Sequence, residues 1–123
     1  MLISSYIYIP VSDFEQAAKW YAKNLDFKLV YKDALYYDMR NANGVKIMLI
    51  PGEKSITSQM KYSTGEQASY GFCVEDYDSV RAKLEANGVK IGEEYEYFGR
   101  SFSFYDLEGN KIEIWEDYDY NLK

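Results

Sequence analysis

The 123-residue sequence contains no histidine, only one cysteine and no long run of apolar residues. Without histidine, no imidazole is available to bind zinc, iron or nickel, and no Ser-His-Asp triad can form. The lone Cys73 excludes a disulfide within the chain and is typical of a reducing compartment. No apolar run approaches the ~20 residues of a membrane helix, and the N-terminus lacks a secretory pattern. We therefore expect a cytoplasmic protein that does not associate with membranes.

Positive charge is also scarce. Lys and Arg number 14 against 20 Asp and Glu, which gives a formal net charge of −6. Phosphate backbones would be repelled, so nucleic-acid binding is disfavoured. A cationic small ligand would be favoured, although acidity that serves solubility alone explains the same charge. Aromatic residues are abundant, and the 14 tyrosines combine a flat apolar face with a polar tip that suits a wet pocket or an interface.

One pattern occurs twice in the chain. The first copy opens with a strand-like segment at 7–13 and closes at 44–49, and the second runs from 70–76 to 109–114. A helical stretch follows the opening segment in each copy. Internal repeats are a strong guide to architecture, and two strand–helix–strands copies predict two similar half-sheets around one cavity.

Each copy carries a helix-start signal. Gln16 follows Asp13 by three residues, which is a capping-box pattern, and Asp76 opens a second helix that ends before Gly88. Strands are expected at 3–10, 27–32, 35–40 and 45–50, and again at 68–74, 89–97, 101–105 and 111–116. We predict a single α+β domain over 1–123, with module one at about 3–50, a connecting loop at 51–66, module two at about 67–116 and an acidic tail at 117–123. For the loop, a surface connection is favoured over a flap.

Three stretches resemble the vicinal oxygen chelate superfamily, which includes glyoxalases, bleomycin-resistance proteins and extradiol dioxygenases. They are 6–13 with 19–27, 72–76 with 84–89, and 104–114, the last being the most specific. Asp26 and Leu107 depart from the Gly and Pro of the family pattern, but Asp tolerates a left-handed backbone. The resemblance implies two βαβββ modules that form a curved mixed sheet with a cleft, and often a homodimer. Whether the modules pair within one chain or between chains stays open.

In metal-dependent members of that superfamily, four cleft positions bind the ion. The resemblance places these positions on Tyr6, Met48, Ser69 and Glu113. A phenol is protonated at neutral pH, a thioether is a soft ligand and a serine hydroxyl is a weak one, so Glu113 alone is a normal ligand for a hard metal ion. One carboxylate does not hold a divalent ion against water. We therefore expect no metal and no other cofactor.

Strand alternation provides an independent check on this register. The same face should carry Tyr8, Lys46, Ile50, Gly71, Cys73 and Trp115, and the opposite face should be apolar, with Ile7, Ile9, Ile47, Leu49, Tyr70, Phe72, Val74, Ile112 and Ile114. The candidate ligand-binding residues are Tyr6, Tyr8, Met48, Ser69, Cys73, Glu113 and Trp115. Two other interpretations remain: these side chains fill the cleft themselves, or they form a dimer contact.

The favoured hypothesis is a metal-free binding protein that sequesters an aromatic or cationic small molecule. Aromatic faces would stack on the ligand or attract its charge, and Glu113 would supply a counter-charge. The first alternative is a lyase, isomerase or dioxygenase of the same superfamily in which Glu113 acts as general acid or base. The second is a protein-interaction module. Cys73 is expected to be a buried, inert thiol, because no histidine or nearby cation activates it in the sequence.

Overall fold

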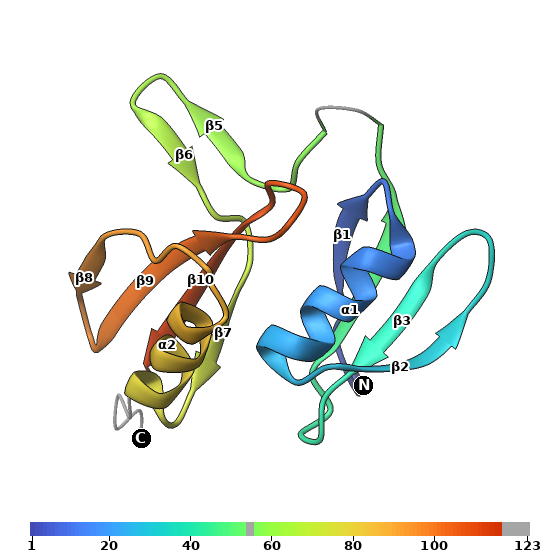
Figure 1. Ribbon diagram of the computed structural model, residues 1–123, viewed down its shortest axis with the longest axis horizontal. Helices are drawn as coiled ribbons and strands as arrows, with labels where there is room; N and C mark the ends of the chain where they lie inside the picture. The colour runs from blue at the N-terminus through green and yellow to red at the C-terminus, as the bar shows by residue number, and fades with distance from the viewer. Residues whose placement is uncertain (54–55, 117–123) are drawn as a thin grey trace. The chain divides into compact units, whose positions relative to one another are not determined.

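The computed structural model describes residues 1–53 and 56–116 (Figure 1). The acidic tail predicted at 117–123 lies outside the described residues. The chain divides into two compact units, Met1–Ser58 with Leu107–Asn110, and Gln59–Asp106 with the residues from Lys111 onward. Each unit contains one helix and a four-stranded sheet. The α+β class and the pair of βαβββ modules are thus confirmed, whereas the single-domain organisation stays a prediction.

The first unit follows the predicted strand–helix–strands plan. Its elements are β1 (Ile7–Val11), α1 (Phe14–Leu25), β2 (Lys28–Lys32), β3 (Tyr37–Arg40) and β4 (Lys46–Pro51), and its sheet order is β1-β4-β3-β2. The helix begins where predicted, because the Asp13 carboxylate accepts a hydrogen bond from the Gln16 backbone N–H at 3.0 Å. It ends at Asp26, whose φ of 59° is left-handed. Asp26 therefore takes the conformation for which the family pattern uses glycine.

The second unit repeats this plan. It contains β7 (Gly71–Val74), α2 (Tyr77–Ala86), β8 (Glu94–Glu96), β9 (Arg100–Tyr105) and β10 (Lys111–Glu116), in the sheet order β7-β10-β9-β8. Asp76 caps α2 by accepting from the Ser79 N–H at 3.1 Å, and Gly88 follows the helix with a φ of 83°. Within the described residues, no helix is long and apolar enough to cross a membrane.

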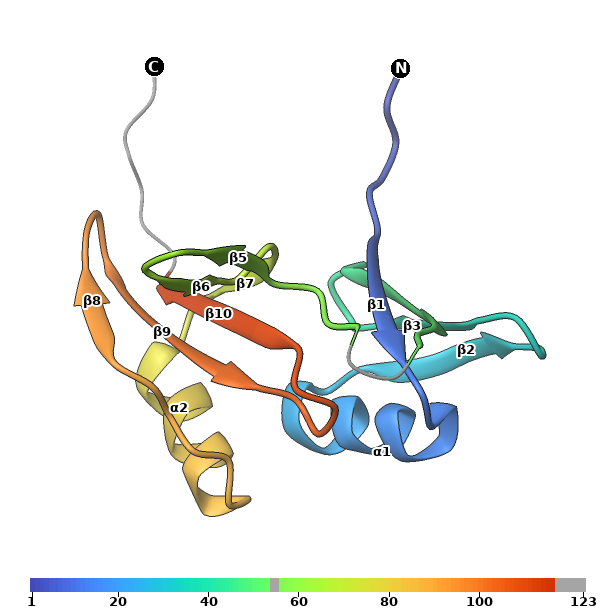
Figure 2. The ribbon, with the colours of Figure 1, turned by 90° about the horizontal axis from the view of Figure 1, so that it is seen from above.

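A hairpin lies in the stretch that was predicted as a connecting loop. Its strands are β5 (Met60–Tyr62) and β6 (Gly65–Gln67), so the connecting segment predicted at 51–66 contains strand structure that the sequence did not predict. All six strand residues are exposed, so the hairpin has no buried face from which sequence alternation could reveal it. In the second unit the hairpin and α2 lie on opposite sides of β10 (Figure 2).

The buried face of each sheet is the one covered by its helix. Ile47 and Leu49 of β4 and Ile112 and Ile114 of β10 are all fully buried, as is Ile9 of β1. Burying one such side chain contributes about 1.5–3 kcal/mol. The predicted apolar face is therefore confirmed at its centre, while Ile7, Tyr70, Phe72 and Val74 are half-buried. The opposite face of each sheet is left more open to solvent and is available for a site.

The turn after β9 belongs by its contacts to the first unit. Glu108 Oε1 accepts from the Ser12 N–H at 2.7 Å and from the Ser12 hydroxyl at 2.9 Å, and Oε2 accepts from the Asp13 N–H at 2.9 Å. A carboxylate in this place also complements the positive end of the α1 dipole. This part of the 104–114 stretch therefore has a structural role at the start of α1.

Asn110, in the same turn, is fully buried. Its Nδ2 donates to the Pro10 carbonyl at 2.9 Å, and its Oδ1 accepts from the Ser58 N–H at 2.9 Å. One side chain thus satisfies both a backbone acceptor and a backbone donor that lie far from it in the sequence, as buried backbone groups require.

Candidate functional site

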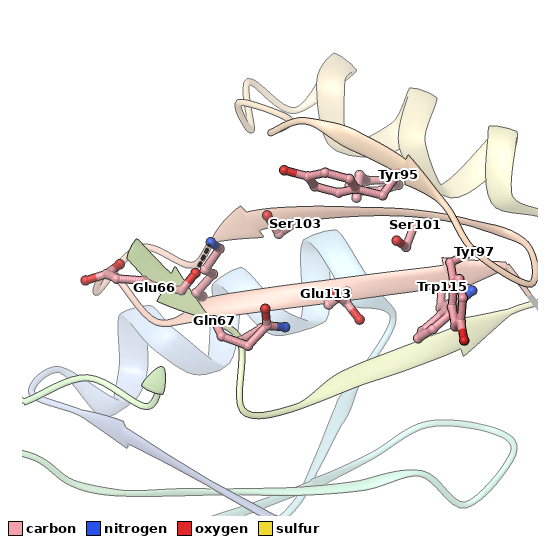
Figure 3. Close-up of a pocket in the computed structure, with 11 residues that line it drawn as sticks. Glu66, Gln67, Tyr95, Tyr97, Ser101, Ser103, Glu113 and Trp115 are labelled. Carbon is pink, nitrogen blue, oxygen red and sulfur yellow. Dashed lines mark hydrogen bonds between the residues drawn. The ribbon is translucent and has the colours of Figure 1, made fainter. Parts of the chain in front are cut away.

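A cavity of about 410 Å³ opens in the second unit over β9 and β10 (Figure 3). This volume falls within the ~300–1,000 Å³ typical of small-molecule sites. Four aromatic residues line it, Tyr95, Tyr97, Phe102 and Trp115, and the hairpin contributes Glu66 and Gln67. Every described lining residue belongs to the second unit.

The floor of the cavity is set by the register of β9 and β10. Glu113 pairs directly with Ser103, and Trp115 pairs with Ser101. These four side chains share the face opposite to the buried Phe104 and Ile114 side chains, because side chains alternate across a strand. Cross-strand partners have Cβ atoms about 4.5–5.5 Å apart, so the Glu113 carboxylate and the Ser103 hydroxyl can reach one ligand atom together.

Two glycines leave the side chains of Glu113 and Ser103 uncovered. A Cβ added at Gly71 would lie 2.5 Å from the Glu113 carbonyl oxygen, and one added at Gly92 would lie 2.8 Å from the Ser103 carbonyl oxygen and 3.3 Å from its hydroxyl. Real Cβ atoms do not approach backbone oxygens so closely, so only glycine allows the backbone at 71 and 92 to lie this close to Glu113 and Ser103. It also leaves no side chain beside Glu113 or Ser103 at these positions.

Trp115 forms a fixed aromatic wall. Its indole N–H donates to the Phe98 carbonyl at 3.1 Å, and Phe98 adopts a left-handed φ of 50°, which is uncommon for an aromatic residue. Such backbone strain is often found at binding sites. Because its N–H already has a partner, the indole offers a ligand its ring surface rather than a hydrogen bond.

Two tyrosines extend this wall. Tyr95 on β8 is 60% exposed and Tyr97 in the following turn is 70% exposed, so both rings have surface available for contact. The Tyr95 hydroxyl donates to Glu93 at 2.9 Å, and this hydrogen bond raises the pKa of Tyr95. The phenol therefore stays neutral over the physiological range, and its ring contributes surface rather than charge.

The charge that the cavity presents is negative. Lys111, which lines it, donates from Nζ to the Glu66 carbonyl at 2.8 Å and lies 6.0 Å from the ring centroid of Tyr105. The Glu66 carboxylate accepts from the Tyr105 hydroxyl at 3.1 Å. By contrast, the half-buried Glu113 carboxylate has no hydrogen-bond or ion-pair partner among residues 1–53 and 56–116. Burial without a partner costs free energy, so Glu113 is the group that a bound cation would satisfy.

The equivalent strands of the first unit contain a carboxylate that is already neutralised. Met48 on β4 lies between Tyr8 on β1 and Asp38 on β3. Asp38 is buried and forms ion pairs with Arg40 at 3.1 Å and Lys46 at 3.7 Å. Asp38 is therefore already neutralised by cations of its own unit, whereas Glu113 lines the cavity without such an ion pair among the described residues.

Two predicted tyrosines of the first unit do lie together. The Tyr6 and Tyr8 rings are 4.9 Å apart, both are about half exposed, and the hydrogen bond between them raises the pKa of Tyr8. Tyr8 also pairs with Met48 across β1 and β4. The structure thus brings the three predicted residues of this unit together on one sheet face. The hollow predicted between the two modules stays a prediction.

Of the four predicted residues in the second unit, Glu113 and Trp115 line the cavity, whereas Ser69 and Cys73 are not among its lining residues. Cys73 pairs in register with Trp115 but is exposed, so the expectation of a buried thiol is wrong for this chain. The reason is topological: β7 is an edge strand, and Cys73 lies on the face away from α2.

Sequence reasoning missed several residues of the cavity and of the first-unit face. They are Gln67, Tyr95, Tyr97, Ser101 and Ser103 in the cavity, and Asp38 and Arg40 in the first unit. A signal existed for some of them. Ser101 and Ser103 alternate with the buried Phe102 and Phe104 along β9, so they must share one face.

The positions that bind metal in the superfamily do not fit a divalent ion in this chain. The four residues supply a phenol, a thioether, a hydroxyl and one carboxylate, a set unsuited to either hard or borderline ions. Within the described part of the chain, no group of three or more His, Cys, Asp or Glu residues is placed to hold a metal ion.

Comparison with known proteins agrees with this architecture. No curated protein matches the chain. Among solved structures, the fosfomycin resistance protein FosX from Listeria monocytogenes has a TM-score of 0.74 at 19% identity, covering 95% of this chain and 94% of that chain, and it has also been solved with Mn(II). TnmS3, an antibiotic binding protein from Streptomyces sp. CB03234, has a TM-score of 0.70 at 22% identity, covering 94% and 98%.

A third similar structure is a superfamily member from Sphaerobacter thermophilus, with a TM-score of 0.74 at 19% identity over 95% of this chain and 98% of that chain. These identities are low, so the structural likeness concerns the fold. The family model described as "Glyoxalase/Bleomycin resistance protein/Dioxygenase superfamily" matches residues 3–114. On this match over most of its length, together with the two βαβββ modules, the chain belongs to the glyoxalase/bleomycin resistance protein/dioxygenase superfamily.

Proposed function

We propose that this protein binds and sequesters a small aromatic cation, without a metal ion and without making or breaking a bond. The observation that carries the proposal is the half-buried Glu113 carboxylate, which has no partner among the described residues and lies in a cavity lined by Tyr95, Tyr97 and Trp115. A cation over an aromatic face gains about 0.5–2 kcal/mol, depending on how far it is desolvated. The carboxylate adds a direct attraction that is stronger in a partly enclosed site than in water.

Relatives support this proposal by analogy. The similar structures include an antibiotic binding protein and a fosfomycin resistance protein, so the fold accommodates ligand-binding members. The lone cysteine and the acidic composition favour the cytoplasm, and the superfamily resemblance favours a homodimer. In this proposal Ser69 and Cys73 extend the ligand-binding surface of the second unit, and Tyr6, Tyr8 and Met48 form a ligand-binding face of the first unit.

An enzyme of the same superfamily is the competing hypothesis. It requires either a metal, which the donor residues do not suit, or acid–base work by Glu113. A general base needs a substrate proton within hydrogen-bond reach and a matched pKa. The Ser101 and Ser103 hydroxyls beside Glu113 are not activated by a base in the described residues. Sequestration therefore accounts for the side chains of the cavity without an added metal ion and without a catalytic proton transfer.

The proposal predicts that Glu113→Gln weakens binding of a flat organic cation by about tenfold or more, because a charge-assisted contact is lost. The probe is 1-naphthylmethylammonium, and its dissociation constant is measured by NMR titration. Glu75→Gln is the matched control, since Glu75 is exposed, lies in the same unit and does not line the cavity. Equal affinities of the wild type and both variants, or stoichiometric Mn, Fe, Ni or Zn in chelator-free preparations, would contradict the proposal.

A further inference from the structure

The surroundings of Glu113 narrow the kind of cation that the cavity can hold. Ser103 on β9 pairs directly with Glu113 on β10. Figure 3 shows the Gln67 amide on the hairpin side of the Glu113 carboxylate. A serine hydroxyl and an amide oxygen both accept hydrogen bonds. The negative charge is therefore accompanied by neutral acceptors rather than enclosed by aromatic rings alone.

This arrangement differs from the one that suits a quaternary ammonium. Such a cation has no N–H, so it is held by aromatic faces and by charge, and it would leave these polar groups without a hydrogen bond. A protonated amine can donate one N–H to Glu113 and a second to Ser103, because cross-strand partners lie within reach of one nitrogen atom. Anions are disfavoured, because two carboxylates, Glu66 and Glu113, and a single cation, Lys111, line the cavity.

The aromatic walls determine what the amine must carry. Trp115 is held by its hydrogen bond to the Phe98 carbonyl at 3.1 Å, and Tyr95 lies over the strand that carries Ser101 and Ser103 (Figure 3). An aromatic surface fixed in this way favours a flat ring that can stack on it. The ring needs to be joined to the amine by a short linker, because the rings and the carboxylate line the same cavity of about 410 Å³.

Resting on the proposed function, we infer that the ligand is an aromatic primary or secondary amine, bound as its ammonium ion between Glu113 and Ser103 with its ring against Trp115. The structure assigns Ser103 as the residue that distinguishes an N–H-bearing cation from a quaternary one. Gly92 and Gly71 contribute by leaving this pair of side chains uncovered.

The test uses four probes built on the naphthalene ring system: 1-naphthylmethylamine, its N,N,N-trimethyl derivative, the neutral alcohol 1-naphthalenemethanol and the anion 1-naphthaleneacetate. We expect the amine to bind the wild-type protein about tenfold more tightly than the trimethyl compound, since a hydrogen bond to a charged group contributes about that factor. Ser103→Ala should weaken amine binding by roughly three- to tenfold and leave the trimethyl compound unchanged. Ser63→Ala, in the exposed hairpin turn, is the control and should change neither.

The outcomes separate this inference from the proposed function. Trimethyl binding as tight as amine binding, or an equal loss for both in Ser103→Ala, would overturn the inference and leave cation binding intact. Failure of the amine, the trimethyl compound and the alcohol to bind, or tightest binding of the acetate, would overturn both. Tighter binding of the amine that depends on Ser103 supports both.

Discussion

Replacing Asn110 with alanine is expected to lower the free energy of unfolding by about 2–4 kcal/mol. Asn110 is fully buried and bonds two backbone groups at once, the Pro10 carbonyl and the Ser58 N–H, each at 2.9 Å. Alanine would leave both groups without this partner in a region that water does not reach. An unsatisfied buried polar group costs about 1–3 kcal/mol, and two of them act together here.

Urea denaturation followed by circular dichroism measures this loss. Asn43→Ala is the matched control, because Asn43 lies in an exposed turn, and it should change stability by no more than about 0.5 kcal/mol. If both variants were equally stable, the Asn110 bonds would not hold this turn to the first unit. The structural role assigned to this part of the 104–114 stretch would then be wrong.

Alkaline solution is expected to destabilise the protein through Tyr77. Burial, followed by the 3.0 Å hydrogen bond that its hydroxyl donates to Glu94, raises the pKa of Tyr77 from about 10 to about 12. The unfolded chain loses this proton near pH 10, whereas the folded chain keeps it until about pH 12. The stabilisation from the protonated phenol is therefore fully present below pH 10 and is lost as the pH rises toward 12.

The expected loss over that interval is about 1–2 kcal/mol, once solvent screening is allowed for. Urea midpoints measured at steps from pH 9 to pH 12 should fall more steeply in the wild type than in Tyr77→Phe, which cannot ionise. Tyr62→Phe is the control, since Tyr62 is 59% exposed, and it should retain the wild-type slope. Parallel curves for the wild type and Tyr77→Phe would show that this phenol does not contribute to the alkaline transition.

The fold could be predicted from the sequence because its signals are local. Asp13 and Asp76 each cap a helix with the bond that their spacing indicates, and Gly88 takes a left-handed conformation after the second helix. Alternation also placed Ile47 and Ile112 on the buried face of their strands. These features depend on a few neighbouring residues, so one sequence suffices to reveal them.

Apart from Trp115, the walls of the site could not be predicted, because they depend on packing between distant segments. Gln67 lines the cavity because of an exposed hairpin that leaves no apolar pattern in the sequence. Tyr95 and Tyr97 gain their role from the position of β8 beside β9. The charge balance is non-local as well: Asp38 is neutralised by Arg40 and Lys46, whereas Glu113 is left without a partner in the described chain.

The most direct test of the central claim is to locate a bound aromatic ammonium ion on the protein. Intermolecular nuclear Overhauser effects would be recorded with 1-naphthylmethylammonium near its wild-type dissociation constant and protein labelled on its aromatic side chains. The account predicts contacts from the naphthyl ring to the Trp115 indole and the Tyr95 ring, and a marked weakening of these contacts in Glu113→Gln at the same probe concentration. Contacts to the half-buried Trp20 of α1 in place of Trp115, or contacts that persist unchanged in Glu113→Gln, would contradict it.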